Sequence, residues 1–131
     1  MSKLIATIEK IQTIDSLNIV SFDFSGNKLK MMSLELDEKI KVGTKVSLGV
    51  KSTSIAIAKE FSGQLSYSNQ LNTVIDEIDN GELLSSINLK IGEIHLESII
   101  TLDSSKAMNL KVGDSVTALI KANELSITEV L

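Results

Sequence analysis

The chain has 131 residues, a net charge of −4 and no cysteine. Its negative charge repels polyanions, and all of its cationic residues are Lys, so the guanidinium fork that reads phosphate and guanine is absent. Aromatic residues make up only 3% of the chain, too few for base-stacking platforms. We therefore expect no nucleic-acid binding by this chain alone, no disulfide and no thiolate metal site.

The composition is that of a packed globular protein, with 43% hydrophobic and 23% charged residues. No apolar run reaches the length of a signal peptide core or a membrane span, so we expect a cytoplasmic protein without membrane contact. Small folding units of about 60 residues bury little surface, and this favours association into a homo-oligomer.

An internal repeat divides the sequence. Residues 41–51 (Lys-Val-Gly-Thr-Lys-Val-Ser-Leu-Gly-Val-Lys) recur in one register as residues 111–121 (Lys-Val-Gly-Asp-Ser-Val-Thr-Ala-Leu-Ile-Lys). Hydrophobic positions further upstream match in a register three residues shorter, which indicates a small insertion in the second copy after Leu96. The repeat predicts a first module at 1–60, a Ser- and Gly-rich linker at 61–69 and a second module at 70–131.

The predicted elements within the first copy are short strands. Val20, Phe22 and Phe24 alternate with polar residues before a Gly26-Asn27 turn, and the same alternation continues through Leu29. Two further apolar stripes follow at residues 46–50 and 55–57. The second copy repeats these patterns, so we expect about five strands in each module.

One helical segment is expected, inside the insertion of the second copy. Asp103 or Ser104 can cap a short turn through residues 105–109. Five antiparallel strands with a short helix between the third and fourth are typical of the OB-type Greek-key barrel. The predicted fold is therefore all-β, with two tandem five-stranded OB-like barrels and a short helix in the second; a split sandwich is the alternative.

Donors for a small tetrahedral dianion gather in the second copy. Such an ion needs hydroxyl and amide donors and some positive charge, with few acceptors nearby. Lys121 closes the fourth predicted strand, out of phase with the apolar stripe, and Thr101 and Ser104 flank the helix start. Further donors precede the first strand of this copy, at Ser66, Ser68 and Asn69.

Three segments resemble one known family. Residues 66–71 (Ser-Tyr-Ser-Asn-Gln-Leu), 101–104 (Thr-Leu-Asp-Ser) and above all 110–122 (Leu-Lys-Val-Gly-Asp-Ser-Val-Thr-Ala-Leu-Ile-Lys-Ala) are similar to the motifs of the Mop, or TOBE, molybdate-binding family. The resemblance covers nearly the whole chain in the paired-module, or di-Mop, arrangement. It implies that the chain binds molybdate or tungstate as its ligand.

The resemblance also implies the site residues. In the second copy, the oxyanion-binding positions are Ser66, Ser68, Thr101, Ser104, Lys121 and the backbone amide of Ala122. Ser68 stands where the family usually has Arg. In the first copy, Lys51 and Ser52 match the Lys121-Ala122 element, and Ser33 falls where Thr101 lies. Sites of this family form where modules or subunits meet, which implies a homo-oligomer, either a dimer or a trimer.

The expected function is storage, homeostasis or sensing of the oxyanion, without catalysis. No nucleophile, base and orienting group come together in the sequence, and the single His95 has no Cys or second His to share a metal. Two alternatives stay open. In the first alternative, the chain is a protein-interaction module that has lost its ligand. In the second, it is the detached ligand domain of a molybdate-responsive regulator.

Overall fold

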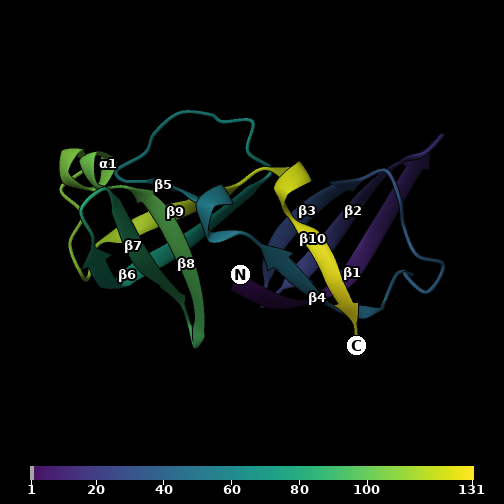
Figure 1. Cartoon of the computed structure of the whole chain (residues 1–131). Helices are drawn as coiled ribbons and strands as arrows, with labels where there is room; N and C mark the ends of the chain where they lie inside the picture. Colours follow the sequence, from purple (N-terminus) through teal and green to yellow (C-terminus); the bar gives the residue numbers. More distant parts are fainter. Residues whose placement is uncertain (1) are drawn as a thin grey trace.

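The computed structural model describes residues 2–131, which form two five-stranded antiparallel sheets side by side (Figure 1). The predicted all-β class, with two OB-like barrels and one short α-helix, is confirmed. The strands are β1 (Ser2–Ile14), β2 (Leu17–Phe24), β3 (Asn27–Ser33), β4 (Lys45–Val50), β5 (Ala56–Ala58), β6 (Asn69–Asn80), β7 (Leu84–Ile91), β8 (Ile94–Thr101), β9 (Ser115–Ile120) and β10 (Ser126–Val130); the helices are α1 (Leu102–Ala107) and the 3₁₀ turns η1 (Ser52–Ser54) and η2 (Ala122–Glu124).

The two sheets exchange their last strands. The first sheet has the order β10-β4-β1-β2-β3 and the second β5-β9-β6-β7-β8. Strand β10, from the end of the second repeat, pairs with β4, and β5, from the end of the first repeat, pairs with β9. Figure 1 shows the yellow β10 lying among the strands of the first repeat.

This exchange bears on the module boundaries predicted at 1–60 and 70–131. Those boundaries follow the sequence repeat, whereas each sheet takes four strands from one repeat and one strand from the other. Residues 59–68 form neither helix nor strand, and β6 begins at Asn69, the last residue of the predicted linker. Neither repeat alone therefore supplies all five strands of a sheet.

The core follows the alternation read from the sequence. In β2, Val20, Phe22 and Phe24 are fully buried. In β6, alternate residues from Leu71 to Ile75 are buried, while Asn72 and Val74 are exposed. A half-buried strand face of this kind is stabilised by about 25 cal/mol for each Å² of apolar surface removed from water. The hydrophobic residues of both sheets join in a single cluster, which holds the two repeats together.

The repeated Lys-Val-Gly motif has the same structural role in both copies. The amide N of Gly43 donates to the carbonyl O of Ile8 at 2.7 Å, and that of Gly113 donates to Ile75 at 2.8 Å. Each acceptor precedes an irregularity in the β1–β2 or β6–β7 pairing. Both glycines have positive φ, +92° and +94°, which explains why glycine recurs at this position.

Helix α1 begins earlier than the sequence suggested. The predicted cap was Asp103 or Ser104, but the N-cap is Thr101, whose Oγ1 accepts a hydrogen bond from the amide of Ser104 at 3.1 Å. The prediction was wrong because Ser104 supplies the capped amide rather than the cap. At the other end of the helix, Lys59 Nζ donates to the carbonyls of Met108 and Asn109 and pairs with Asp114 at 3.1 Å.

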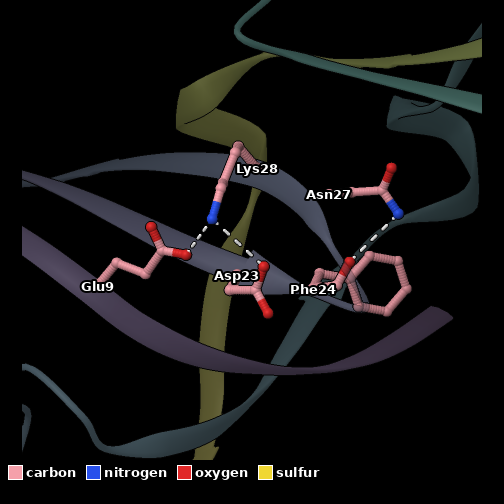
Figure 2. A network of polar contacts seen from close by, with 5 residues as sticks. All are labelled: Glu9, Asp23, Phe24, Asn27 and Lys28. Carbon is pink, nitrogen blue, oxygen red and sulfur yellow. Dashed lines mark hydrogen bonds and ion pairs between the residues drawn. The ribbon is translucent and has the colours of Figure 1, made fainter.

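A polar network ties β3 to its neighbours (Figure 2). Lys28 Nζ on β3 contacts the carboxylates of Glu9 and Asp23, the latter at 3.4 Å. These contacts raise the pKa of Lys28, with the hydrogen bond to Glu9 as the main cause. Asn27 Nδ2 donates to the carbonyl of Phe24 at 3.2 Å and closes the β2–β3 turn. Lys28 is thus engaged within its own sheet.

Candidate functional site

Two equivalent junctions connect the repeats. At each one, the start of the first strand and the 3₁₀ turn of one repeat meet the third strand of the other. Junction one contains Ser2, the Lys51-Ser52 element and β8; junction two contains Asn69, the Lys121-Ala122 element and β3. These junctions carry the lysines singled out in the sequence.

At junction two, Asn69 binds the edge of β3. Its side chain is fully buried, its Oδ1 accepts from the amide of Lys30 at 2.7 Å, and its Nδ2 donates to the carbonyl of Lys30 at 2.9 Å. The side-chain amide thus takes the place of a neighbouring strand. Asn69 was expected to offer a free donor, but both of its polar atoms are used in this contact.

Junction one has the same plan with different residues. Ser2, the counterpart of Asn69, accepts from the amide of Glu97 at 3.1 Å through its Oγ. The carboxylate of Glu97 in turn accepts from Ser52 at 2.9 Å and from Ser86 at 2.7 Å. The hydroxyls of Ser86 and Ser52 hold the pKa of Glu97 below its ordinary value. The predicted ligand Ser52 therefore already donates to a carboxylate of the same chain.

The strand register brings some of the predicted site residues together. Asn69 pairs with Ile120, so Ser68, just before Asn69, and Lys121, just after Ile120, lie at the same end of the second sheet. Ser66 precedes Ser68 by two residues, and Ala122 begins η2 next to Lys121. Lys121, Ser66 and Ser68 are exposed at this end.

Thr101 and Ser104 lie at the opposite end of the same sheet. Thr101 pairs with Leu84, and the adjacent Ser85 pairs with Asn80 at the far end of β6. The 12 residues of β6 span on the order of 35 Å along the strand. Thr101 Oγ1 and Ser104 Oγ are 2.9 Å apart and exposed. Within one chain, therefore, they do not share a small ligand with Lys121.

Ser33 is displaced by one position from its expected match. It pairs with Asn18, the counterpart of Ser85, and Ser85 pairs with Ile100. Ser33 therefore corresponds to Ile100, so the alignment with Thr101 was wrong by one residue, because the three-residue difference falls directly after this strand. Ser33 Oγ forms a local turn with Glu35.

One open hollow is lined by neither Lys51 nor Lys121. An open groove of about 970 Å³ runs between β3, the following loop and β10, lined by residues that include Met31, Leu36 and Ile127. A smaller hollow of about 290 Å³ at junction one is lined by Ser2, Ser52 and Glu97. Residues 2–131 hold no cluster of acidic and His side chains arranged to bind a metal ion.

Two functional candidates escaped the sequence analysis, Glu97 and Lys30. Both are exposed charged residues in the middle of an alternating strand, where a solvent-facing role is usual. Only the contacts between repeats place them at the junctions. The upstream register of the repeat, which is three residues shorter, matches Lys30 with Glu97. The opposite charges of these two residues were a signal that could have been noticed.

Comparison with known proteins supports the family resemblance. The TOBE domain family matches residues 65–127. The structure resembles the cytoplasmic molybdate-binding protein ModG, crystallised with molybdate bound, with a TM-score of 0.90 and 23% identity over 95% of this chain and 93% of that one. No curated protein sequence matches the chain significantly.

No helix in residues 2–131 combines the length and the apolar character needed to cross a membrane. The matched segment contains all three family-like motifs, at residues 66–71, 101–104 and 110–122, and the likeness in fold extends over both repeats. Residues 65–127, which include most of the second repeat, therefore match the TOBE domain family, in agreement with the family predicted from the sequence.

Proposed function

We propose that this chain binds molybdate or tungstate reversibly in the cytoplasm and acts as a store, buffer or sensor without catalysis. Support comes from the TOBE match, which spans Ser66 to Lys121, and from the shared fold with a protein described as cytoplasmic and molybdate-binding. The observation that carries the proposal is the pairing of Asn69 with Ile120, which sets Ser68 next to Lys121.

The chemistry of that end suits an oxyanion. Lys121 supplies positive charge, and the hydroxyls of Ser66 and Ser68 and the amide of Ala122 are donors for the oxygens. None of the ion pairs among residues 2–131 uses Lys121 or Lys51, so both ammonium groups are available. The exposure of this end leaves room for a ligand to enter.

A second copy of the chain completes the proposed site. Because Thr101 and Ser104 lie at the far end of β6 from Lys121, these hydroxyls reach the ligand of another chain only in an assembly. Exposed apolar residues next to them, among them Leu83 (81%) and Leu84 (54%), fit such a contact. We propose a homo-oligomer with the ligand held between subunits.

Isothermal titration with sodium molybdate, tungstate and sulfate tests the function. We expect saturable binding of the two metal oxyanions and much weaker binding of sulfate, which is smaller and cannot reach all donors at once. Mass in solution, measured on the same samples, tests the assembly. Absence of heat with both molybdate and tungstate would overturn the proposed function.

A further inference from the structure

The two junctions differ in charge at one equivalent position. Glu97 pairs with Asn88 across β7–β8, and Lys30 pairs with Ser21 across β2–β3 at the corresponding step. The backbone amides of both residues donate to the first strand of the other repeat, to Ser2 and Asn69 respectively. Glu97 and Lys30 are therefore structural counterparts with opposite charges.

At junction one, the carboxylate of Glu97 already occupies the donors. It accepts from Ser52, next to Lys51, at 2.9 Å, and from Ser86 at 2.7 Å. The resulting low pKa keeps this carboxylate ionised at neutral pH. An incoming dianion would meet a fixed negative charge and would find the Ser52 hydroxyl already in use.

At junction two, no such carboxylate is present at the equivalent position. Lys30 replaces Glu97, and Ala122 replaces Ser52. None of the ion pairs among the described residues involves Lys30, in contrast to Lys28 two residues earlier. The acidic side chain of η2, Glu124, accepts from Ser54 of η1 at 3.0 Å. Two lysines, Lys30 and Lys121, therefore belong to the same junction.

We propose that the chain has one oxyanion site. The carboxylate of Glu97, which belongs to the same chain, closes junction one to oxyanions, and Lys30 is a further binding residue that, with Lys121, makes junction two the oxyanion site. Lys30 comes from the first repeat, so the site needs both repeats even though Ser66, Ser68, Lys121 and Ala122 all lie in the second. This inference rests on the proposed function and specifies which junction performs it.

A reciprocal charge reversal tests the proposal by calorimetric titration with sodium molybdate. Lys30→Glu places at junction two the glutamate that junction one has as Glu97. It is expected to lower the affinity for molybdate on the order of 100-fold. Lys30→Met, which removes the charge alone, is expected to lower it about tenfold. Glu97→Lys is expected to raise the number of molybdate ions bound per chain.

The matched control is Lys10→Glu, which reverses the charge of an exposed β1 residue and changes the net charge equally. The molybdate affinity of this variant should stay within about twofold of that of the parent chain.

The outcomes separate this inference from the proposed function. If the parent chain binds molybdate but Lys30→Glu behaves like Lys10→Glu, or Glu97→Lys binds no additional ion, the single-site proposal is wrong and the function stands. If the parent chain binds no molybdate, the proposed function fails with it. Thermal melting of each variant confirms folding before titration, and tungstate-soaked crystals should show density at Lys30 and Lys121 and none at Glu97.

Discussion

The side chain of Asn69, rather than its backbone, connects the second sheet to the first. It is fully buried and makes both of its hydrogen bonds to the backbone of Lys30. Asn69→Asp keeps the size but turns the donor into a second acceptor facing the carbonyl of Lys30. We expect a loss of about 2–3 kcal/mol in the free energy of unfolding.

Urea unfolding measures this loss, with Asn72→Asp as the matched control. Asn72 lies on the same strand, three residues along, and is exposed, so the same chemical change there should cost less than about 0.5 kcal/mol. Equal stabilities of the two variants would contradict the role given to Asn69.

Asp114 makes a contribution to stability that depends on pH. The backbone amide of Lys111 donates to its carboxylate at 2.9 Å and Lys59 pairs with it, and both lower its pKa in the folded state. A depressed pKa contributes stability that is complete above the unfolded-state pKa and is lost as pH falls through the folded-state pKa.

The comparison of the parent chain with Asp114→Asn measures this contribution. The parent's advantage in unfolding free energy should be constant down to about pH 4 and should shrink below it. An advantage that grew on acidification would show that the sign, and with it the assigned contacts, is wrong.

At the scale of elements, the exchange of β5 and β10 makes each sheet depend on both repeats. A chain of residues 1–60 lacks the β10 that covers the edge of β4, and a chain of residues 61–131 lacks the β5 that covers β9. Uncovered strand edges promote association. We expect neither half to be a stable folded monomer, and we expect the two halves to form a complex when mixed.

Circular dichroism and size-exclusion chromatography of the halves, separately and mixed, check this expectation. The intact chain is the control for the native spectrum and elution volume. Two monomeric halves, each with cooperative melting near that of the intact chain, would contradict the contribution of the exchanged strands.

The sequence was informative about elements but not about their partners. Alternation in segments such as residues 20–24 predicted the strands, and the recurring Gly43 and Gly113 revealed the repeat, because both signals are local. Strand β10 joins the first sheet through contacts between residues more than 70 positions apart, such as Ser126 with Gly49. The periodicity of a sequence carries no information on contacts of this kind. The strand exchange was therefore not predictable from the repeat.

The candidate site was likewise predictable only in part. Lys121 and Ser68 were found together because their flanking residues pair within one repeat. The separation of Thr101 from Lys121 depends on the length of β6 and on the order in which the strands pair. The contact of Ser52 with Glu97 depends on the packing of one repeat against the other. Sequence motifs list the donors of a site without fixing how far apart they lie.

For the whole molecule, the central expectation is oxyanion binding at junction two, through Lys121. Equilibrium dialysis against molybdate, with molybdenum determined by mass spectrometry, measures it most directly on the parent chain, on Lys121→Ala and on Lys111→Ala, an exposed lysine in the turn before β9. We expect retained molybdenum in the parent and in Lys111→Ala, and an affinity lowered at least about tenfold in Lys121→Ala. Equal retention by the parent chain and Lys121→Ala would contradict oxyanion binding through Lys121.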